Sequence, residues 1–154
     1  MANGNTHAPG AVGTAGTQAF SNNLTYASGS IFAWDLTTES TTTGFDKVTG
    51  ATGNTFAAAG AFHVVTNLDF STTFWDVQEQ WSTIFSGFST LTGWGANTAV
   101  EVYNTSGTLR TDVASQGAFT VSGTTLTWNY ATVPEPSTAL AGILLGAGLL
   151  RRRR

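Results

Sequence analysis

The stretch GTTLTWNY, residues 123–130, decides the fold class because its side chains alternate strictly between two kinds. Large and mainly apolar side chains occupy one set of alternate positions and smaller polar ones the other: Leu126, Trp128 and Tyr130 against Thr125, Thr127 and Asn129. A period of two is typical of a half-buried β-strand. We therefore predict a strand over these residues.

The same alternation recurs in shorter stretches along the chain. They are NLTYA (23–27), GSIFAWDL (29–36), FHVV (62–65) and TAVEVYN (98–104). Glycine, asparagine and serine, which form turns, separate them. Threonine, phenylalanine, tryptophan and valine favour pleated surfaces, so the composition agrees with the pattern. We predict an all-β body, for which a parallel β-solenoid and an antiparallel β-sandwich both suit the spacing of the strands.

One segment departs from this alternation. In STTFWDVQEQWSTIFSGF (71–88), large apolar residues recur at intervals of three and four. This spacing predicts a short helix near residues 73–80, with Ser71 or Thr72 as its N-cap. A strand beginning at Ser82 would place the same aromatic residues in the core.

Length and composition limit the classes of function. The chain has 154 residues, enough for one domain with appendages. Residues 1–133 hold eight acidic side chains and only two basic ones, Lys47 and Arg110, so this part lacks the basic surface that binds nucleic acid. Cysteine is absent, which excludes disulfides, thiolate nucleophiles and cysteine-ligated metals.

No arrangement of residues in the sequence points to catalysis. A nucleophile needs a neighbouring base, and the histidines are His7, in an N-terminus expected to be flexible, and His63, expected to face solvent from a strand. No catalytic or phosphate-binding motif occurs. We expect a protein that is not an enzyme and that uses no cofactor and no metal.

Two further groups of residues are candidate ligand sites. Stacking of a solenoid would bring some aspartates together as a calcium or carbohydrate site, although aspartates in turns usually bond to nearby backbone. The aspartates in question are Asp35, Asp46, Asp69 and Asp76. Among the tryptophans, Trp94 lies between turn residues and is the best candidate for an exposed, sugar-stacking ring, although covering a core edge is the stronger expectation for it.

The chain is expected to divide into five parts. These are a flexible N-terminus (1–13), a β-rich extracellular body (14–130), a linker (131–137), a hydrophobic transmembrane-like helix (138–150) and an arginine cluster (151–154). The apolar run is shorter than the roughly 20 residues that cross a bilayer, so its hold on a membrane would be weak. Its apolar members are Ala139, Leu140, Ile143, Leu144, Leu145, Leu149 and Leu150. Positive residues stay on the cytoplasmic side, so the four arginines would stop translocation: Arg151, Arg152, Arg153 and Arg154.

Residues 133–154 carry a resemblance to a known sorting signal. The triplet Pro134, Glu135 and Pro136, the apolar run and the terminal arginines, in this order, resemble the PEP-CTERM signal of Gram-negative envelope and exopolysaccharide-associated proteins. The resemblance implies that an exosortase, a membrane-embedded cysteine protease, recognises the triplet and removes the tail. The two prolines would keep the triplet extended and open to an enzyme.

The body carries a second resemblance. HAPGAVGTAGTQAFSNNLTYASGSIFAWDL (7–36), GFDKVTG (44–50) and FWDVQEQWSTIF (74–85) resemble autotransporter-like, β-helical surface proteins. This resemblance favours the parallel β-solenoid. Such proteins carry an export signal, and residues 1–13 do not have the pattern of one, so we expect the chain to be the closing part of a longer solenoid.

Together these observations predict a structural or adhesive protein of the cell surface or extracellular matrix. Its expected partners are an exosortase, the inner membrane for as long as the tail remains, and exopolysaccharide; nucleic acid is not expected. Two alternatives remain. One is a fragment of a β-helical enzyme that acts on polysaccharides, and the other is a surface protein whose tail stays in the membrane as a permanent anchor.

Overall fold

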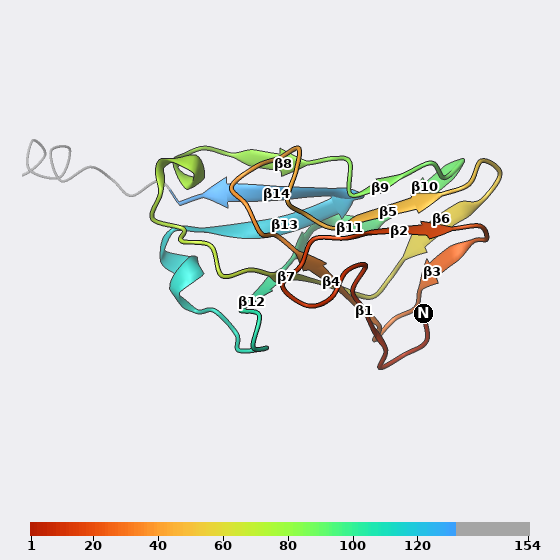
Figure 1. The fold of residues 1–154 in the computed structure, drawn as a ribbon, viewed down its shortest axis with the longest axis horizontal. Coiled ribbons are helices and arrows are strands. Elements are labelled where there is room, and N and C mark those ends of the chain that lie inside the picture. Colours follow the sequence, from red (N-terminus) through yellow and green to blue (C-terminus); the bar gives the residue numbers. More distant parts are fainter. Residues whose placement is uncertain (132–154) are drawn as a thin grey trace, which may run out of the picture.

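The computed structural model describes residues 1–131, and these residues form an all-β structure, as predicted (Figure 1). The first ten strands are β1 (Thr6–His7), β2 (Thr17–Phe20), β3 (Leu24–Tyr26), β4 (Ile31–Asp35), β5 (Lys47–Gly50), β6 (Thr55–Ala58), β7 (Ala61–Val65), β8 (Glu79–Trp81), β9 (Phe85–Ser86) and β10 (Thr90–Thr92). The last four are β11 (Trp94–Ala99), β12 (Glu101–Tyr103), β13 (Gly117–Gly123) and β14 (Thr125–Tyr130). Two short 3-10 helices, η1 (Thr73–Asp76) and η2 (Asp112–Ser115), complete the described elements.

Three of the four sheets are entirely parallel. Their strand orders are β1-β4-β7-β12, β2-β5-β9 and β10-β6-β3. The chain visits these sheets in the same order three times, through β1, β2 and β3, then β4, β5 and β6, then β7, β9 and β10. Each strand therefore pairs with the strand that occupies the same place one circuit earlier or later.

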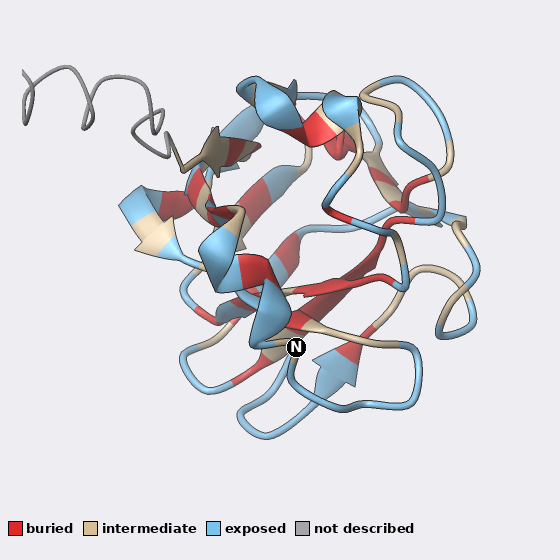
Figure 2. Ribbon diagram, turned by 90° about the vertical axis from the view of Figure 1, so that its left-hand side faces the viewer, coloured by how far each residue is buried: buried red, intermediate tan, exposed pale blue. Residues whose placement is uncertain are grey.

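In-register pairing stacks aromatic side chains in the interior. Phe32 of β4 lies opposite Phe62 of β7, and their rings meet edge to face with centroids 5.2 Å apart. Phe56 and Phe85, from two different sheets, lie 4.4 Å apart between centroids. Figure 2 shows buried residues on the strands in the middle of the molecule and exposed residues mainly on the turns. Aromatic pairs of this kind contribute about 0.5–1.5 kcal/mol beyond the burial of their area.

The fourth sheet is antiparallel and has the order β11-β13-β14-β8. Strand β14 coincides with the stretch predicted first from the sequence, and Leu126 and Trp128 point into the core as expected. Strand β8 comes from the third circuit of the chain and pairs with β14, which joins the C-terminal hairpin to the parallel sheets. The indole N–H of Trp128 donates a hydrogen bond to the backbone oxygen of Trp75 at 2.8 Å, so η1 is fixed to the same sheet.

The prediction of a helix near residues 73–80 is mostly wrong. Only the four residues of η1 are helical, and the hydroxyl of Thr72 at their N-cap donates to Glu39 Oε1 at 2.6 Å instead of capping the helix. Val77 lies within the predicted helix as one of the apolar residues at this spacing, yet it is 56% exposed. Residues 79–81 instead pair with β14, and this tertiary pairing overrides the local spacing of apolar residues. The alternative, a strand starting at Ser82, is not found either, because β8 ends at Trp81 and β9 begins at Phe85.

Part of the N-terminus expected to be flexible belongs to the sheet structure. Thr6 and His7 form β1 and pair in parallel with Ile31 and Phe32. The backbone N–H of Gly4 donates to the oxygen of Gly29 at 2.9 Å. The sequence lacks alternation here because only two residues are in the strand.

The predicted C-terminal hydrophobic helix and the arginine cluster lie outside the described residues. Within residues 1–131, no helix is long and apolar enough to cross a membrane.

Candidate functional site

Two buried carboxyl groups lie where β4 ends and β5 begins. Asp35 is the last residue of β4, and Asp46 directly precedes β5. Asp46 accepts hydrogen bonds from two backbone N–H groups, that of Gly16 at 2.6 Å on Oδ1 and that of Asp35 at 3.0 Å on Oδ2. Asp35 accepts the N–H of Gly13 at 2.7 Å on Oδ1. The pair therefore fastens the loop around residues 13–16 to the second circuit of the chain.

The surroundings of these carboxyl groups favour their neutral form. Burial raises the pKa of Asp46 to about 6, against the opposing effect of its two backbone hydrogen bonds, and the charge of Asp35 raises it further. Burial also raises the pKa of Asp35, opposed by the hydrogen bond from Gly13. Asp35 Oδ2 is buried and has no hydrogen-bond partner among residues 1–131. An unpartnered buried oxygen is costly when the carboxyl is ionised, which favours the protonated form of Asp35.

The other two candidate aspartates do not join this pair. Asp69 and Asp76 are exposed, and Asp69 accepts the N–H of Ser71 at 2.9 Å within a turn. Asp35 and Asp46 are only 1% and 0% exposed, so a polysaccharide cannot reach them. The stacking of strands thus gathers two of the four candidates, and their contacts serve the backbone instead of a surface site.

His63 points outward from β7, as predicted, and lies in a small polar cluster. Its Nε2 is 3.4 Å from Oε2 of Glu101, and its ring stacks on Tyr103 with centroids 4.9 Å apart. Burial lowers the pKa of His63, while the charge of Glu101 raises it. No serine, threonine or cysteine among residues 1–131 is hydrogen-bonded to this ring, so the cluster lacks an activated nucleophile.

His7 is the residue that sequence reasoning placed wrongly. It is 6% exposed, with Nδ1 hydrogen-bonded to the hydroxyl of Tyr26 and Nε2 to the side-chain oxygen of Gln18. Burial raises the pKa of Tyr26 far above its usual value. His7 joins the first strands of all three parallel sheets. A two-residue strand in NTHAPG gives no periodic signal that would reveal this role.

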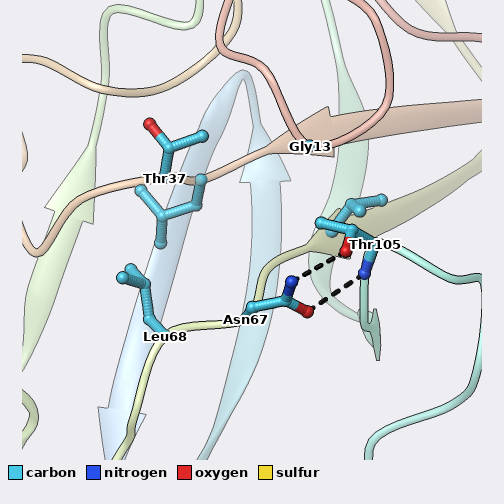
Figure 3. Close-up of a pocket in the computed structure, with 7 residues that line it drawn as sticks. Gly13, Thr37, Asn67, Leu68 and Thr105 are labelled. Carbon is cyan, nitrogen blue, oxygen red and sulfur yellow. Dashed lines mark hydrogen bonds between the residues drawn. The ribbon is translucent and has the colours of Figure 1, made fainter.

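A cavity of about 200 Å³ lies beside the loop that Asp35 fastens (Figure 3). Its polar groups are already paired, because Asn67 donates through Nδ2 to Oγ1 of Thr105 at 2.7 Å and accepts the Thr105 N–H at 3.2 Å. Gly13, Thr37 and Leu68 complete the labelled lining. The cavity therefore holds no charged group and few free hydrogen-bonding atoms.

All five tryptophans are buried, so none offers an exposed ring for stacking on a sugar. Trp94 is 5% exposed and donates its indole N–H to the oxygen of Gly60 at 2.6 Å. The stronger expectation for Trp94, that it covers a core edge, is confirmed.

The residues of the expected sorting signal, Pro134 to Arg154, lie outside the described residues. Within residues 1–131, no group of three or more histidines, cysteines, aspartates or glutamates is placed to hold a metal ion. The chain matches no family model, no curated protein and no solved structure.

Proposed function

We propose that this chain is an exported structural or adhesive protein of the cell surface or extracellular matrix, delivered by its C-terminal tail. One observation carries the proposal, namely the order of parts in residues 134–154: Pro-Glu-Pro, a run of small and apolar residues, and four arginines. Each part is common by itself, whereas their order provides an extended recognition segment, a short membrane segment and a stop to translocation.

The tail would act through a membrane-embedded exosortase. Pro134, Glu135 and Pro136 would lie extended in the groove of the protease, outside the membrane, while Arg151 and its neighbours stay in the cytoplasm. Cutting near the triplet would release the body to the outer surface or the medium, where it would associate with exopolysaccharide. The tail would then be an address instead of a lasting part of the protein.

For the body we propose the architecture of a short parallel β-solenoid. Support comes from the three parallel sheets that the chain visits in a fixed order, and from the stacking of Phe32 on Phe62 between successive circuits. An antiparallel β-sandwich would not produce parallel pairing in three of four sheets. A stacked scaffold of this kind suits a structural role. Its buried carboxyls, Asp35 and Asp46, bind backbone amides of the same chain.

The intact mass of the protein recovered from its native host tests this proposal. Processing predicts a species in the surface fraction or medium that ends between Pro134 and Ser137. A variant with Pro134→Ala and Pro136→Ala should accumulate uncut in the membrane fraction, whereas Thr138→Ala, outside the triplet, should be cut like the wild type. Full-length wild-type protein in the membrane fraction would favour the permanent anchor and refute processing.

The alternative function, a polysaccharide-acting enzyme, is tested separately. Purified protein incubated with host exopolysaccharide should release no reducing ends. Release of reducing ends that Asp69→Asn or Asp76→Asn abolishes would refute the structural role.

A further inference from the structure

Long stretches of the chain contain no acidic or basic side chain. Residues 17–34, 48–68 and 80–100 hold no aspartate, glutamate, lysine or arginine. Besides β7, β11 and most of β4, these stretches contain six strands: β2, β3, β6, β9 and β10 in full and most of β5. The six strands gather in the right-hand part of Figure 1. One sheet of the molecule, β10-β6-β3, is thus formed without any charged residue.

The outer side of this sheet presents threonines in register. Leu24, Tyr26 and Phe56 are buried in the core, so the residues that alternate with them face outward. Four of these are exposed threonines, which we name the threonine face: Thr25, Thr55, Thr90 and Thr92.

The register arranges the threonine face as two rows across the strands. Thr90 lies opposite Thr55 in one row, while Thr92 and Thr25 both lie opposite Ala57 in the other. Parallel pairing sets about 4.8 Å between neighbouring strands and about 6.6 Å between alternate residues of one strand. The result is a two-dimensional lattice of hydroxyl and methyl groups in which Ala57 leaves one gap.

The hydroxyls of the threonine face are available to a ligand. None of the four Oγ1 atoms makes a hydrogen bond to any residue within 1–131, and the contact of Thr55 with Asn23 uses its backbone N–H. Some threonines elsewhere use their hydroxyls within the protein: Thr37 Oγ1 donates to the oxygen of Gly44 at 2.9 Å, for example. Exposed threonine hydroxyls ordinarily bond to water, so water is the first partner to consider for this lattice.

We propose that the threonine face binds the surface of ice. An uncharged lattice of hydroxyl and methyl groups can hold first-layer water in a repeat similar to the spacing of oxygen atoms in ice. Charged side chains would interrupt that layer because they bind their own hydration shells, and this sheet has none. Binding would occur across many weak contacts at once, which is why the in-register spacing matters more than any single hydroxyl.

Other occupants of this face fit the observations less well. Sugars are usually held by exposed aromatic rings together with polar groups, and all five tryptophans are buried. A stable interface with a second copy needs a well-packed core of apolar or aromatic residues. The threonine face offers only hydroxyls and methyl groups, so it does not meet this need. The face is therefore assigned to ordered water and not to a protein or a glycan.

Uptake into slowly growing ice tests the proposal, with the full-length protein and a non-binding protein of similar size in the same solution. We expect the wild type to be enriched in the ice several-fold over the non-binding protein. Thr90→Lys places a charge on the threonine face and should abolish the enrichment. Thr6→Lys is the matched control, because it puts the same charge on an exposed strand position of another sheet and should leave the enrichment unchanged. Ala57→Thr fills the gap and should increase the enrichment.

Tryptophan fluorescence checks that each variant is folded, and Thr92→Lys replaces Thr90→Lys if the latter is not. Equal amounts of wild type and non-binding protein in the ice would overturn the proposal. So would a folded Thr90→Lys variant with undiminished enrichment. Retardation of the wild type by dextran in a native gel, without uptake into ice, would also overturn it and assign the face to a neutral polysaccharide.

Discussion

Replacement of Asp46 by asparagine should change the way in which the stability of the protein depends on pH. Asp46 is fully buried, and its pKa is raised from the usual 3.8 to about 6 in the folded protein. The folded state therefore binds a proton more tightly than the unfolded state does. The contribution of this group to stability is greatest below pH 4, falls as the pH rises toward 6, and stays constant above that.

The size of the effect follows from the raised pKa. A change from 3.8 to about 6 corresponds to a loss of about 3 kcal/mol in the free energy of unfolding, on an order-of-magnitude basis. Asp46→Asn cannot ionise, so the variant should not show this loss. The free energy of unfolding of the wild type minus that of Asp46→Asn should decrease by roughly 2.4 kcal/mol between pH 4 and pH 7, because the unfolded carboxyl is already partly ionised at pH 4.

Urea unfolding followed by tryptophan fluorescence is the appropriate assay, because all five tryptophans are buried and become exposed on unfolding. The difference between the two proteins is needed, since the lowered pKa of His63 makes the wild type more stable as the pH rises. His63 is present in both proteins, so its effect is largely removed from the difference. A difference that is flat or that increases from pH 4 to pH 7 would refute the assignment of a neutral, buried Asp46.

Two further predictions concern other parts of the molecule. Gly93→Ala should lower the free energy of unfolding by several kcal/mol, because the added Cβ would lie 1.8 Å from the backbone oxygen of Gly123. In the control Gly95→Ala, the nearest atom to the added Cβ is 3.7 Å away, so the loss should be about 1 kcal/mol or less. Chemical unfolding of both variants measures the difference. Glu101→Gln should lower the pKa of His63 further, because the negative charge of Glu101 that raises this pKa is lost while the burial that lowers it remains. An NMR titration measures the pKa of His63. An unchanged or higher value would contradict the contact between His63 and Glu101.

The sequence was sufficient to predict the strands whose large side chains alternate. GSIFAWDL and GTTLTWNY became β4 and β14 because every second side chain is large and enters the core. The short helix was wrong because intervals of three and four arose from residues that serve different elements, η1, β8 and β9. No local pattern could reveal that residues 79–81 pair with β14, some 45 positions later in the chain.

The contacts made by buried polar residues were the least predictable part. Asp35 and Asp46 were recognised as candidates, but their spacing does not show that both turn inward to bind the N–H groups of Gly13 and Gly16. His7 was missed because its partners, Tyr26 and Gln18, are brought to it by parallel stacking and not by proximity in sequence. Such contacts depend on the register between strands, which alternation alone does not determine.

The position of β14 inside its sheet has a mechanical consequence. Strand β14 has β13 on one side and β8 on the other, and the chain leaves it at Tyr130. Any pull on the residues that follow must reach the body through this strand. An edge strand would be peeled away by breaking one ladder of hydrogen bonds, whereas β14 shares the load between two over residues 126–128. If the proposed tail tethers the protein, this arrangement would resist traction at the C-terminal side of the body.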